Sequence, residues 1–205
     1  MTSRTLRLIR ITALFLICIL AGFYASTVVW NGRPDAGVAA DNLVEFVGTL
    51  PDFSLADLNG ELHSISEWSG QPLIINFWAT WCAPCRREMP LLQTLHQERQ
   101  NDSLTVIGIA IDHLDDVSAY ISESGITYQI LAGQQDAMKV GEQFGPDFIA
   151  LPFTVFTAPD GQVLLLHSGE IHADELREIV AISDRVARGQ LTVIEARRAL
   201  SDRPG

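Results

Sequence analysis

Two cysteines, Cys82 and Cys85, are separated by only two residues and lie between segments of different character. The apolar run 72–78 before them is short enough to be a buried strand, and the stretch 86–99 after them favours a helix. A cysteine at the start of a helix meets unpaired backbone amides and the positive end of the helix dipole, which both favour the thiolate. The chain must therefore place a reactive pair where a buried strand gives way to a helix, with Cys82 as the attacking thiolate.

The remaining cysteines and histidines argue against other uses of this pair. Cys18 is the only further cysteine, and it lies in a long uncharged segment, so the cysteines do not form a disulfide framework. A zinc site needs a second cysteine pair or a matching histidine pair, and the five histidines show no such spacing. Covalent haem attachment needs histidine directly after the second cysteine, where this chain has Arg86. The pattern predicts thiol chemistry with no metal and no cofactor.

The N-terminal segment predicts a membrane anchor. Residues 11–30 carry no charge and are mostly apolar, which is long enough for a helix to cross a bilayer. Arg4, Arg7 and Arg10 precede this segment, so the positive-inside rule places the N-terminus in the cytoplasm and the rest of the chain across the membrane. A cleaved signal peptide is the alternative, with the small residues at 38–40 as its cleavage site.

Charge is distributed unevenly along the chain. The formal net charge is −11, yet the four basic residues before Pro34 precede every acidic residue. The remainder is therefore more acidic than the chain as a whole, which is unfavourable for binding the phosphates of a nucleic acid. An acidic surface keeps a domain soluble, and nucleic acid is not an expected partner.

The hydrophobic pattern predicts a series of alternating elements. Strands are predicted at 53–55, 62–65, 73–78, 104–111, 128–131, 153–156 and 163–166. Helices are predicted at 86–99, 115–124, 137–144, 173–188 and 193–200. Asn59-Gly60 predicts a two-residue hairpin turn, and Pro90 should kink the helix that contains it because proline removes an amide donor. The run 104–111 is apolar throughout, as expected of a central strand covered on both faces.

The order of these elements is a hairpin, then alternating strands and helices, then a second hairpin followed by helices. Such alternation indicates an α/β fold with helices on both faces of one sheet. This is the thioredoxin-like arrangement with an added N-terminal β-hairpin and an added central strand–helix unit, preceded by one transmembrane helix. We expect an N-terminus and anchor at 1–30, a linker at 31–46, a thioredoxin-like domain at 47–188 and a helical extension at 189–205.

The residues around the motif resemble a known family. The segment 81–85, Trp-Cys-Ala-Pro-Cys, followed by Arg-Arg-Glu-Met-Pro at 86–90, is similar to the membrane-anchored TlpA/ResA-like branch of the thioredoxin superfamily. The resemblance extends over about residues 48–180. It includes Leu151-Pro152 ahead of a predicted strand, where such proteins place a cis-proline beside the catalytic pair.

Two positions depart from related patterns. Cytosolic thioredoxins carry a buried aspartate six residues before the first cysteine, where this chain has Asn76. The TlpA-like branch instead favours a glutamate three residues after the second cysteine, and Glu88 supplies it. The cis-proline is usually followed by threonine, whereas Phe153 follows Pro152 here and Thr154 comes next. Because this change lies beside the substrate groove, substrate identity does not carry over from the family.

The resemblance implies two further catalytic roles. Cys85 is expected to be the resolving thiol, more buried than Cys82. Glu88, three residues later on the same helix face, is expected to relay its proton directly or through a water. The alternative for Glu88 is an exposed acid near a favourable helix N-terminus.

The resemblance also implies residues that contact the substrate or tune the pair. Pro152 and Leu151 are expected to present backbone to an extended substrate strand, with Trp81 beside them. Trp78 and Trp81 each fit either a place beside the site or ordinary packing. Ala83 and Pro84, between the cysteines, are expected to help set the redox potential.

Members of this family are typically extracytoplasmic thiol–disulfide oxidoreductases, and several reductants among them act in cytochrome c maturation. The resemblance implies a single-pass protein of the bacterial inner membrane whose catalytic domain faces the periplasm and reduces protein disulfides. Its expected partners are a disulfide-containing protein substrate and a membrane thiol-reductant transporter that donates electrons. The motif does not locate the redox potential of the pair.

Three other functions compete with this interpretation. A copper-handling or metalloprotein-assembly module would use the cysteines as metal ligands, but such relatives usually space them by three residues and add a distal histidine. A peroxiredoxin would need a Pro-x₃-Thr-x₂-Cys pattern, and here Ile75 and Ala79 occupy the proline and threonine positions. A purely structural domain would have no need of the intact cysteine pair.

Overall fold

The computed structural model describes residues 48–99, 104–148 and 150–202. The anchor predicted at 11–30 and the linker predicted at 31–46 lie outside these residues. Within the described ranges, no helix is both long enough and apolar enough to cross a membrane.

All strands and helices predicted between residues 53 and 200 are present, with ends that differ by a few residues. The strands are β1 (Ser54–Asp57), β2 (Leu62–Ser64), β3 (Leu73–Trp78), β4 (Thr105–Ile111), β5 (Gln129–Gly133), β6 (Phe153–Thr157) and β7 (Val163–Ser168). The helices are α3 (Ala83–Glu98), α4 (Leu114–Ser124), α5 (Gln135–Glu142), α6 (Ala173–Ala187) and α7 (Val193–Ser201). The pattern missed one short 3₁₀ helix, η1 (Ile65–Trp68), which Ser64 and Glu67 close with a capping box.

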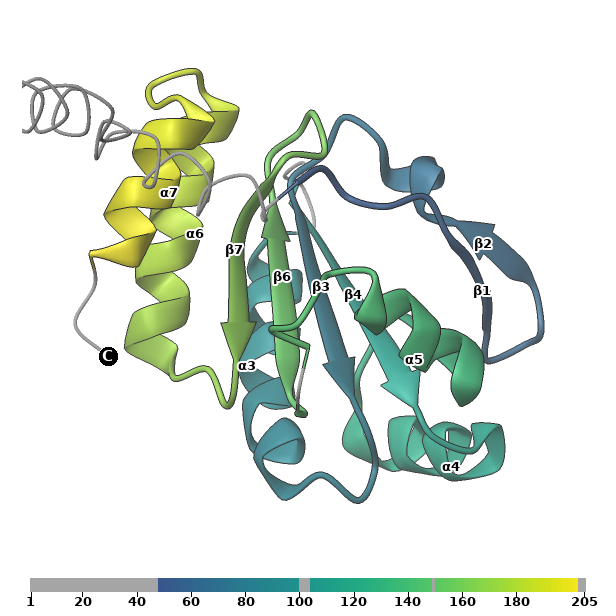
Figure 1. Cartoon of the computed structure of the whole chain (residues 1–205). Helices are drawn as coiled ribbons and strands as arrows, with labels where there is room; N and C mark the ends of the chain where they lie inside the picture. The colour runs from purple at the N-terminus through teal and green to yellow at the C-terminus, as the bar shows by residue number, and fades with distance from the viewer. Residues whose placement is uncertain (1–47, 100–103, 149, 203–205) are drawn as a thin grey trace, which may run out of the picture. The chain divides into compact units, whose positions relative to one another are not determined.

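The strands form one mixed sheet in the order β2-β1-β5-β4-β3-β6-β7 (Figure 1). Strands β3, β4 and β5 are parallel, and the two flanking hairpins pair antiparallel to them. The added strand β5 therefore joins the N-terminal hairpin to the central strands. The predicted thioredoxin-like fold, with its added hairpin and strand–helix unit, is confirmed for this part of the chain.

Alternate residues of β3 enter two separate hydrophobic clusters. Ile74 and Trp78 pack on the face covered by α3, α4, α6 and α7, whereas Ile75 and Phe77 pack on the face covered by α5. Helices α3 and α5 accordingly lie on opposite sides of the sheet (Figure 1). Strand β4 contributes to both clusters in the same way, so it is the doubly covered central strand that its sequence predicted.

The N-terminal hairpin is confirmed, but its predicted two-residue turn is wrong. Ala56 pairs with Leu62, and the Asp57 amide donates to the Glu61 carbonyl at 2.8 Å, so Leu58, Asn59 and Gly60 form the loop. The Asp57 carboxylate accepts from the Asn59 and Glu61 amides, which stabilises this wider turn. Gly60 takes a φ of 83°, the left-handed conformation that glycine adopts without strain.

Two other expectations concern helices. Helix α3 is continuous through Pro90, and the predicted kink stays a prediction. Helix α7, predicted as part of an extension, buries Ala196 and Leu200 in the same cluster as α6. Its first turn is closed by a capping box between Thr192 and Glu195.

Candidate active site

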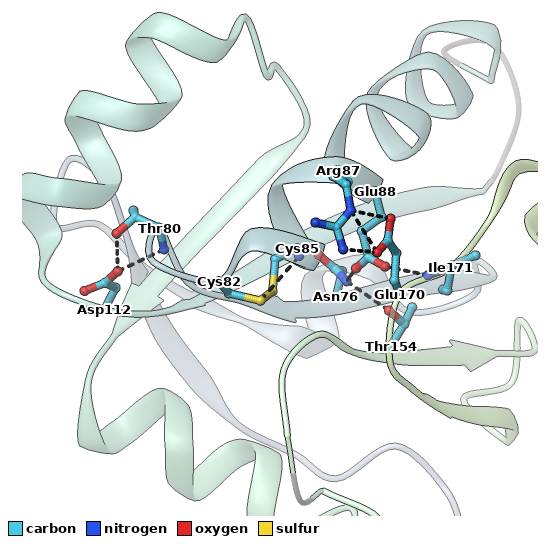
Figure 2. The surroundings of a disulfide bond; sticks show 10 residues. All are labelled: Asn76, Thr80, Cys82, Cys85, Arg87, Glu88, Asp112, Thr154, Glu170 and Ile171. Carbon is cyan, nitrogen blue, oxygen red and sulfur yellow. Dashed lines mark hydrogen bonds and ion pairs between the residues drawn. A yellow bond between two sulfur atoms is a disulfide. The ribbon is translucent and has the colours of Figure 1, made fainter.

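The cysteine pair forms a disulfide at the junction of β3 and α3. Cys82 is the N-cap residue of α3, and Cys85 lies in its first turn with a Cα–Cα separation of 5.3 Å. The loop before them is short because β3 ends at Trp78 and the Cys82 amide already donates to the Ala79 carbonyl. Figure 2 shows the disulfide between two groups of polar side chains.

Cys82 caps the start of α3, the position where an attacking thiolate is predicted. The Cys85 amide donates a hydrogen bond to Cys82 Sγ at 3.3 Å, so one of the unpaired amides of the first turn points at the sulfur. Cys82 is only 5% exposed in the disulfide form and Cys85 is fully buried, so Cys85 is the more buried of the two, as the resemblance implied. Cys82 is covered because it packs into the same cluster as Trp78.

On one side of the disulfide, Asp112 holds the loop that leads to Cys82 (Figure 2). Its carboxylate accepts from the Thr80 amide at 2.9 Å, from the Thr80 hydroxyl at 2.5 Å and from the His113 amide at 2.8 Å. Burial raises the pKa of Asp112, but these hydrogen bonds outweigh burial and the pKa lies below its usual value. Asp112 therefore stays an anion and holds Thr80, which lies two residues before Cys82.

Asp112 and Thr80 were not identified from the sequence, although a signal was present. Asp112 directly follows strand β4, and Thr80 follows the neighbouring parallel strand β3 by two residues. The carboxyl ends of adjacent parallel strands meet at one edge of a sheet, where functional side chains gather. The first polar residue after each strand could therefore have been assigned to the site.

On the other side of the disulfide, Glu88 is a buried carboxyl group with 1% exposure. Its Oε1 accepts from Asn76 Nδ2 at 2.7 Å, and its Oε2 accepts from the Ile171 amide at 2.8 Å. Asn76 Nδ2 also donates to Thr154 Oγ1 at 2.9 Å. Glu88 is thus not an exposed helix acid, and that alternative is wrong.

Burial is the main influence on the protonation of Glu88. It raises the pKa to about 7, because a desolvated carboxylate loses its hydration. The hydrogen bonds from Ile171 and Asn76 lower the pKa in part, while the negative charges of Glu170 and Glu175 raise it. A carboxyl group that titrates near neutral pH can accept and return a proton under physiological conditions.

An ion pair holds the Ile171 amide in place above Glu88. Arg87 Nε lies 2.9 Å from Glu170 Oε1, and Arg87 Nη2 lies 2.5 Å from Glu170 Oε2, a bidentate geometry. Glu170 is the residue before Ile171, so this pair ties the loop between β7 and α6 to helix α3 (Figure 2). The Arg87 side chain is thus paired although it is 60% exposed.

The Leu151–Pro152 peptide bond is cis, as the resemblance implied. Phe153, the next residue, pairs with Phe77 in the register of β6 and β3, which brings Pro152 alongside the end of β3. The Pro152 carbonyl accepts from the Gly169 amide at 2.9 Å, so that carbonyl is occupied within the chain. Leu151 is partly buried against both hydrophobic clusters.

The departure at Phe153 has a structural explanation. Phe153 packs on the α5 face and Thr154 points to the α3 face, where its hydroxyl accepts from Asn76. Asn76 and Thr154 therefore act together, since they are paired residues of β3 and β6. Neither was placed in the site from sequence, because their link to Glu88 depends on the strand register.

The two tryptophans near the motif have different environments. Trp78 is fully buried and packs against Tyr120 with ring centroids 5.5 Å apart, which identifies it as a core residue. Trp81 is 69% exposed beside Cys82 and is free to contact a substrate. Between the cysteines, Ala83 is exposed and Pro84 is half-buried in the first turn of α3.

One group of side chains in the described ranges has spacing suitable for a metal ion, and it excludes the cysteines. Asp57, Glu61 and His63 gather at the β1–β2 hairpin. Their atoms have other roles, since Asp57 caps the turn and His63 Nδ1 lies 2.9 Å from Glu67 Oε2. The cluster is explained by the stability of the hairpin.

Comparison with known proteins agrees with this geometry. Residues 48–165 match the AhpC/TSA family. The chain is 27% identical over 172 residues to the thiol-disulfide oxidoreductase ResA of Geobacillus kaustophilus (strain HTA426), covering 83% of this chain and 92% of ResA. It is 31% identical over 132 residues to the thioredoxin-like protein YneN of Bacillus subtilis (strain 168), covering 62% of this chain and 74% of YneN.

A solved structure gives the same result. A thiol:disulfide interchange protein of the thioredoxin family from Chlorobium tepidum TLS superposes with a TM-score of 0.61 and 25% identity, covering 66% of this chain and 95% of that one. The matched family spans more than half of the chain, and the matched region contains the cysteine pair at a helix start. The chain therefore belongs to the AhpC/TSA family and is a thioredoxin-like thiol–disulfide oxidoreductase.

Proposed function

We propose that this protein reduces disulfides of other proteins outside the cytoplasm by dithiol exchange through Cys82 and Cys85. The observation that carries the proposal is the disulfide at the start of α3 with the buried carboxyl group of Glu88 behind it. The names of the curated relatives support thiol–disulfide exchange as the chemistry.

The reaction takes place in two exchanges. The Cys82 thiolate attacks one sulfur of the substrate disulfide, forms a mixed disulfide and displaces the first substrate thiolate. Cys85 then loses its proton and attacks Cys82 Sγ, which forms the Cys82–Cys85 disulfide and releases the second substrate thiolate. Both substrate thiolates take up protons, so the substrate disulfide is reduced and the cysteine pair is oxidised by two electrons.

Glu88 is the proposed proton acceptor for Cys85. It lies one helical turn after Cys85 on α3, so the two side chains share a helix face. Each carboxylate oxygen has two acceptor sites, and the bonds from Asn76 and Ile171 occupy only one site on each oxygen. The carboxylate can therefore receive the proton directly or through a water and later return it.

The setting of this reaction is also part of the proposal. The anchor expected at 11–30 would hold the domain at the outer face of a bacterial inner membrane, facing the periplasm. A membrane thiol-reductant transporter would return electrons to the pair, and cytochrome c maturation would be one use of the reduced substrates. Family membership does not imply a peroxidase, because Ile75 and Ala79 occupy the positions of the peroxidatic pattern.

Replacement of each cysteine tests the proposed function. We expect Cys82→Ser to abolish exchange, because the attacking thiolate is lost. We expect Cys85→Ser to accumulate mixed disulfides with natural partners, because the resolving thiol is lost. Mass spectrometry of complexes captured from the periplasmic fraction of the source cells identifies the partners.

The third cysteine provides a matched control. Cys18→Ser should exchange normally and should capture no partner, since Cys18 lies outside the motif. Cys82→Ser combined with Cys85→Ser should also capture nothing. A Cys85→Ser protein that forms no mixed disulfide with any partner would contradict the mechanism.

The equilibrium potential of the pair tests the direction of electron flow. Known dithiol couples range from about −270 mV for thioredoxin to about −120 mV for a strong oxidant. We expect this pair to lie near the reducing end, as measured against glutathione or dithiothreitol buffers. A potential near the oxidising end would assign the protein to disulfide formation.

The copper-handling alternative has a separate test. Within the described ranges, no third histidine, cysteine or carboxylate ligand gathers with the cysteines. A measured Cu(I) affinity that survives Cys82→Ser would show that any copper binds elsewhere.

A further inference from the structure

A groove opens beside the active site between helices α4 and α5. It has a volume of about 750 Å³, and its walls include Trp81, Ile111, His113, Met138 and Glu142. We call it the α4–α5 groove. Trp81, the residue next to Cys82, lines the groove. A polypeptide segment bound in the groove would therefore place the adjoining residues of the same polypeptide at the Cys82 sulfur.

Exposed apolar side chains gather around this groove. Five large apolar residues are exposed within the described ranges, and three of them lie at this end of the sheet: Trp81 at 69%, Leu114 at 44% and Met138 at 40%. Trp81 and Met138 line the groove, and Leu114 starts α4 next to His113. Exposed apolar patches of this kind mark interaction sites, and methionine adapts its shape to different partners.

One complete face of α5 is turned to the groove. Gln135, Met138, Lys139 and Glu142 follow the spacing of one helix face, while Ala137 and Val140 pack on the sheet. Gln134 Nε2 and His113 Nδ1, 2.8 Å apart, connect the starts of the two helices at the groove. Strand β5 leads into α5, so the added strand–helix unit supplies one wall of the groove and α4 supplies the other.

The charge of the groove is negative. Its carboxylates are Asp112, Asp116 and Glu142, and its single cation is Lys139. Lys139 Nζ lies 3.2 Å from Asp136, so its charge is partly balanced within α5. Asp112 is occupied by Thr80 and His113, which leaves the exposed Asp116 and Glu142 to face a partner. Asp116 lies in the first turn of α4, where its negative charge also stabilises the helix N-terminus. Its replacement therefore changes the stability of α4 as well as binding.

We propose that the α4–α5 groove binds the segment of a substrate protein that flanks its disulfide, and that it selects a basic residue and a large apolar side chain beside the substrate cysteine. The apolar side chain packs on Trp81 and Met138, and the basic residue faces Asp116 and Glu142. This inference rests on the proposed function, because it names the kind of polypeptide that the same cysteine pair reduces.

Two matched peptides test this selectivity on the full, reduced chain. Each peptide carries one internal disulfide and a leucine beside the cysteine, and they differ only in an adjacent arginine or glutamate. We expect the arginine peptide to be reduced about tenfold faster at low salt, with the ratio falling as ionic strength rises. A third peptide with serine in place of leucine should react more slowly than the arginine–leucine peptide.

Charge reversal locates the effect in the groove. Asp116→Lys combined with Glu142→Lys should abolish or invert the ratio between the two charged peptides. Glu123→Lys combined with Glu178→Lys makes the same double charge reversal at exposed positions outside the groove, and it should keep the ratio of the unaltered chain. Each ratio compares the reduction rates of two peptides by the same variant. A general loss of stability slows both reactions and leaves the ratio unchanged.

The outcomes separate this inference from the proposed function. If the reduced chain reacts with the small uncharged 2-hydroxyethyl disulfide but reduces both charged peptides equally, the groove proposal fails and the oxidoreductase stands. If it reacts with none of these disulfides, the proposed function fails. Backbone amide NMR shifts of a Cys85→Ser protein coupled to the arginine peptide should concentrate in α5; shifts confined to the Leu151–Pro152 loop would overturn the groove proposal.

Discussion

At the scale of single residues, the site separates two carboxyl groups by their surroundings. Asp112 accepts three hydrogen bonds, and its pKa lies below the usual value despite burial. Glu88 is almost fully buried, and burial raises its pKa to about 7 despite two hydrogen bonds. One carboxyl group therefore stays charged and positions the active-site loop, while the other titrates where a proton relay is useful.

Glu88→Gln tests the relay. We expect resolution of the mixed disulfide to slow by about 10- to 100-fold at pH 7, because glutamine cannot accept the Cys85 proton. The rate of the unaltered chain should rise with pH through an inflection near 7, and the variant should lose this inflection and react only at higher pH. Stopped-flow measurement of substrate release from pH 5 to 9 gives both profiles.

Glu98→Gln is the matched control for that measurement. Glu98 is exposed on the same helix, so its replacement should leave the profile unchanged. An inflection near pH 7 that persists in Glu88→Gln would remove Glu88 from the mechanism.

Thr80→Val tests the positioning of the active-site loop. The substitution keeps the shape of the side chain but removes the hydroxyl that donates to Asp112. We expect the free energy of unfolding of the oxidised protein to fall by about 1.5 kcal/mol, the usual value for a hydrogen bond to a charged group. Urea unfolding followed by tryptophan fluorescence measures the change. Thr94→Val, at an exposed hydroxyl bonded to the Pro90 carbonyl, should have a smaller effect.

At the scale of elements, helix α5 has two faces with different roles. Ala137, Val140 and Gly141 are buried on the sheet, whereas Met138 and Glu142 are turned to the α4–α5 groove. Gly141 allows Phe148 to pack tightly, since a Cβ at this position would lie 2.2 Å from the ring. Phe148 in turn makes edge contacts with Phe77 and Phe153, at 5.3 and 5.2 Å between ring centroids.

Gly141→Ala sets helix propensity against packing. Alanine should stabilise the helix by about 1 kcal/mol, whereas overpacking costs about 1–3 kcal/mol. Because Phe77 and Phe153 restrict the Phe148 ring, we expect overpacking to win, with a net loss of about 1 kcal/mol in the free energy of unfolding. Urea unfolding measures it, and adding Phe148→Leu should recover part of the loss. A more stable Gly141→Ala protein would show that the ring moves freely.

At the scale of the whole molecule, stability should depend on the pH through Glu88. The folded protein keeps the Glu88 proton up to a pH of about 7, whereas the unfolded chain releases it near the ordinary value of 4.5. Between these values the folded state binds more protons than the unfolded state, so the free energy of unfolding falls as the pH rises. This contribution is complete below about pH 4.5 and is lost as the pH passes through about 7.

A comparison of pH-dependent stabilities isolates this contribution. This shift in the Glu88 pKa corresponds to about 3 kcal/mol. The free energy of unfolding of the oxidised protein should therefore fall by about that amount through Glu88 between pH 4.5 and 8. Glu88→Gln should lack this part of the decline, and its stability relative to the unaltered protein should therefore improve as the pH rises. Urea unfolding at several pH values measures the difference. A constant difference between the two proteins would show that Glu88 titrates normally.

Much of the fold was predictable because it depends on local patterns. Apolar residues at strand and helix spacing marked every strand and helix among the described residues, apart from η1, which is too short to show a period. The hairpin turn was the exception, since Asp57 caps a wider loop than Asn59-Gly60 alone suggests. Within the site, Cys82 and Cys85 were identifiable from their spacing, whereas the role of Glu88 was implied by the resemblance to the TlpA/ResA-like branch.

By itself, the sequence determined the reactive pair and the elements that carry it, because residue spacing alone places a cysteine at a helix start. Only the tertiary structure decided the partners of Glu88, since Asn76 lies 12 residues before it and the Ile171 amide 83 residues after it. The same holds for Asp112, which meets Thr80 across 32 residues. These contacts depend on strand order and register, which bring distant residues together at the end of the sheet where the disulfide lies.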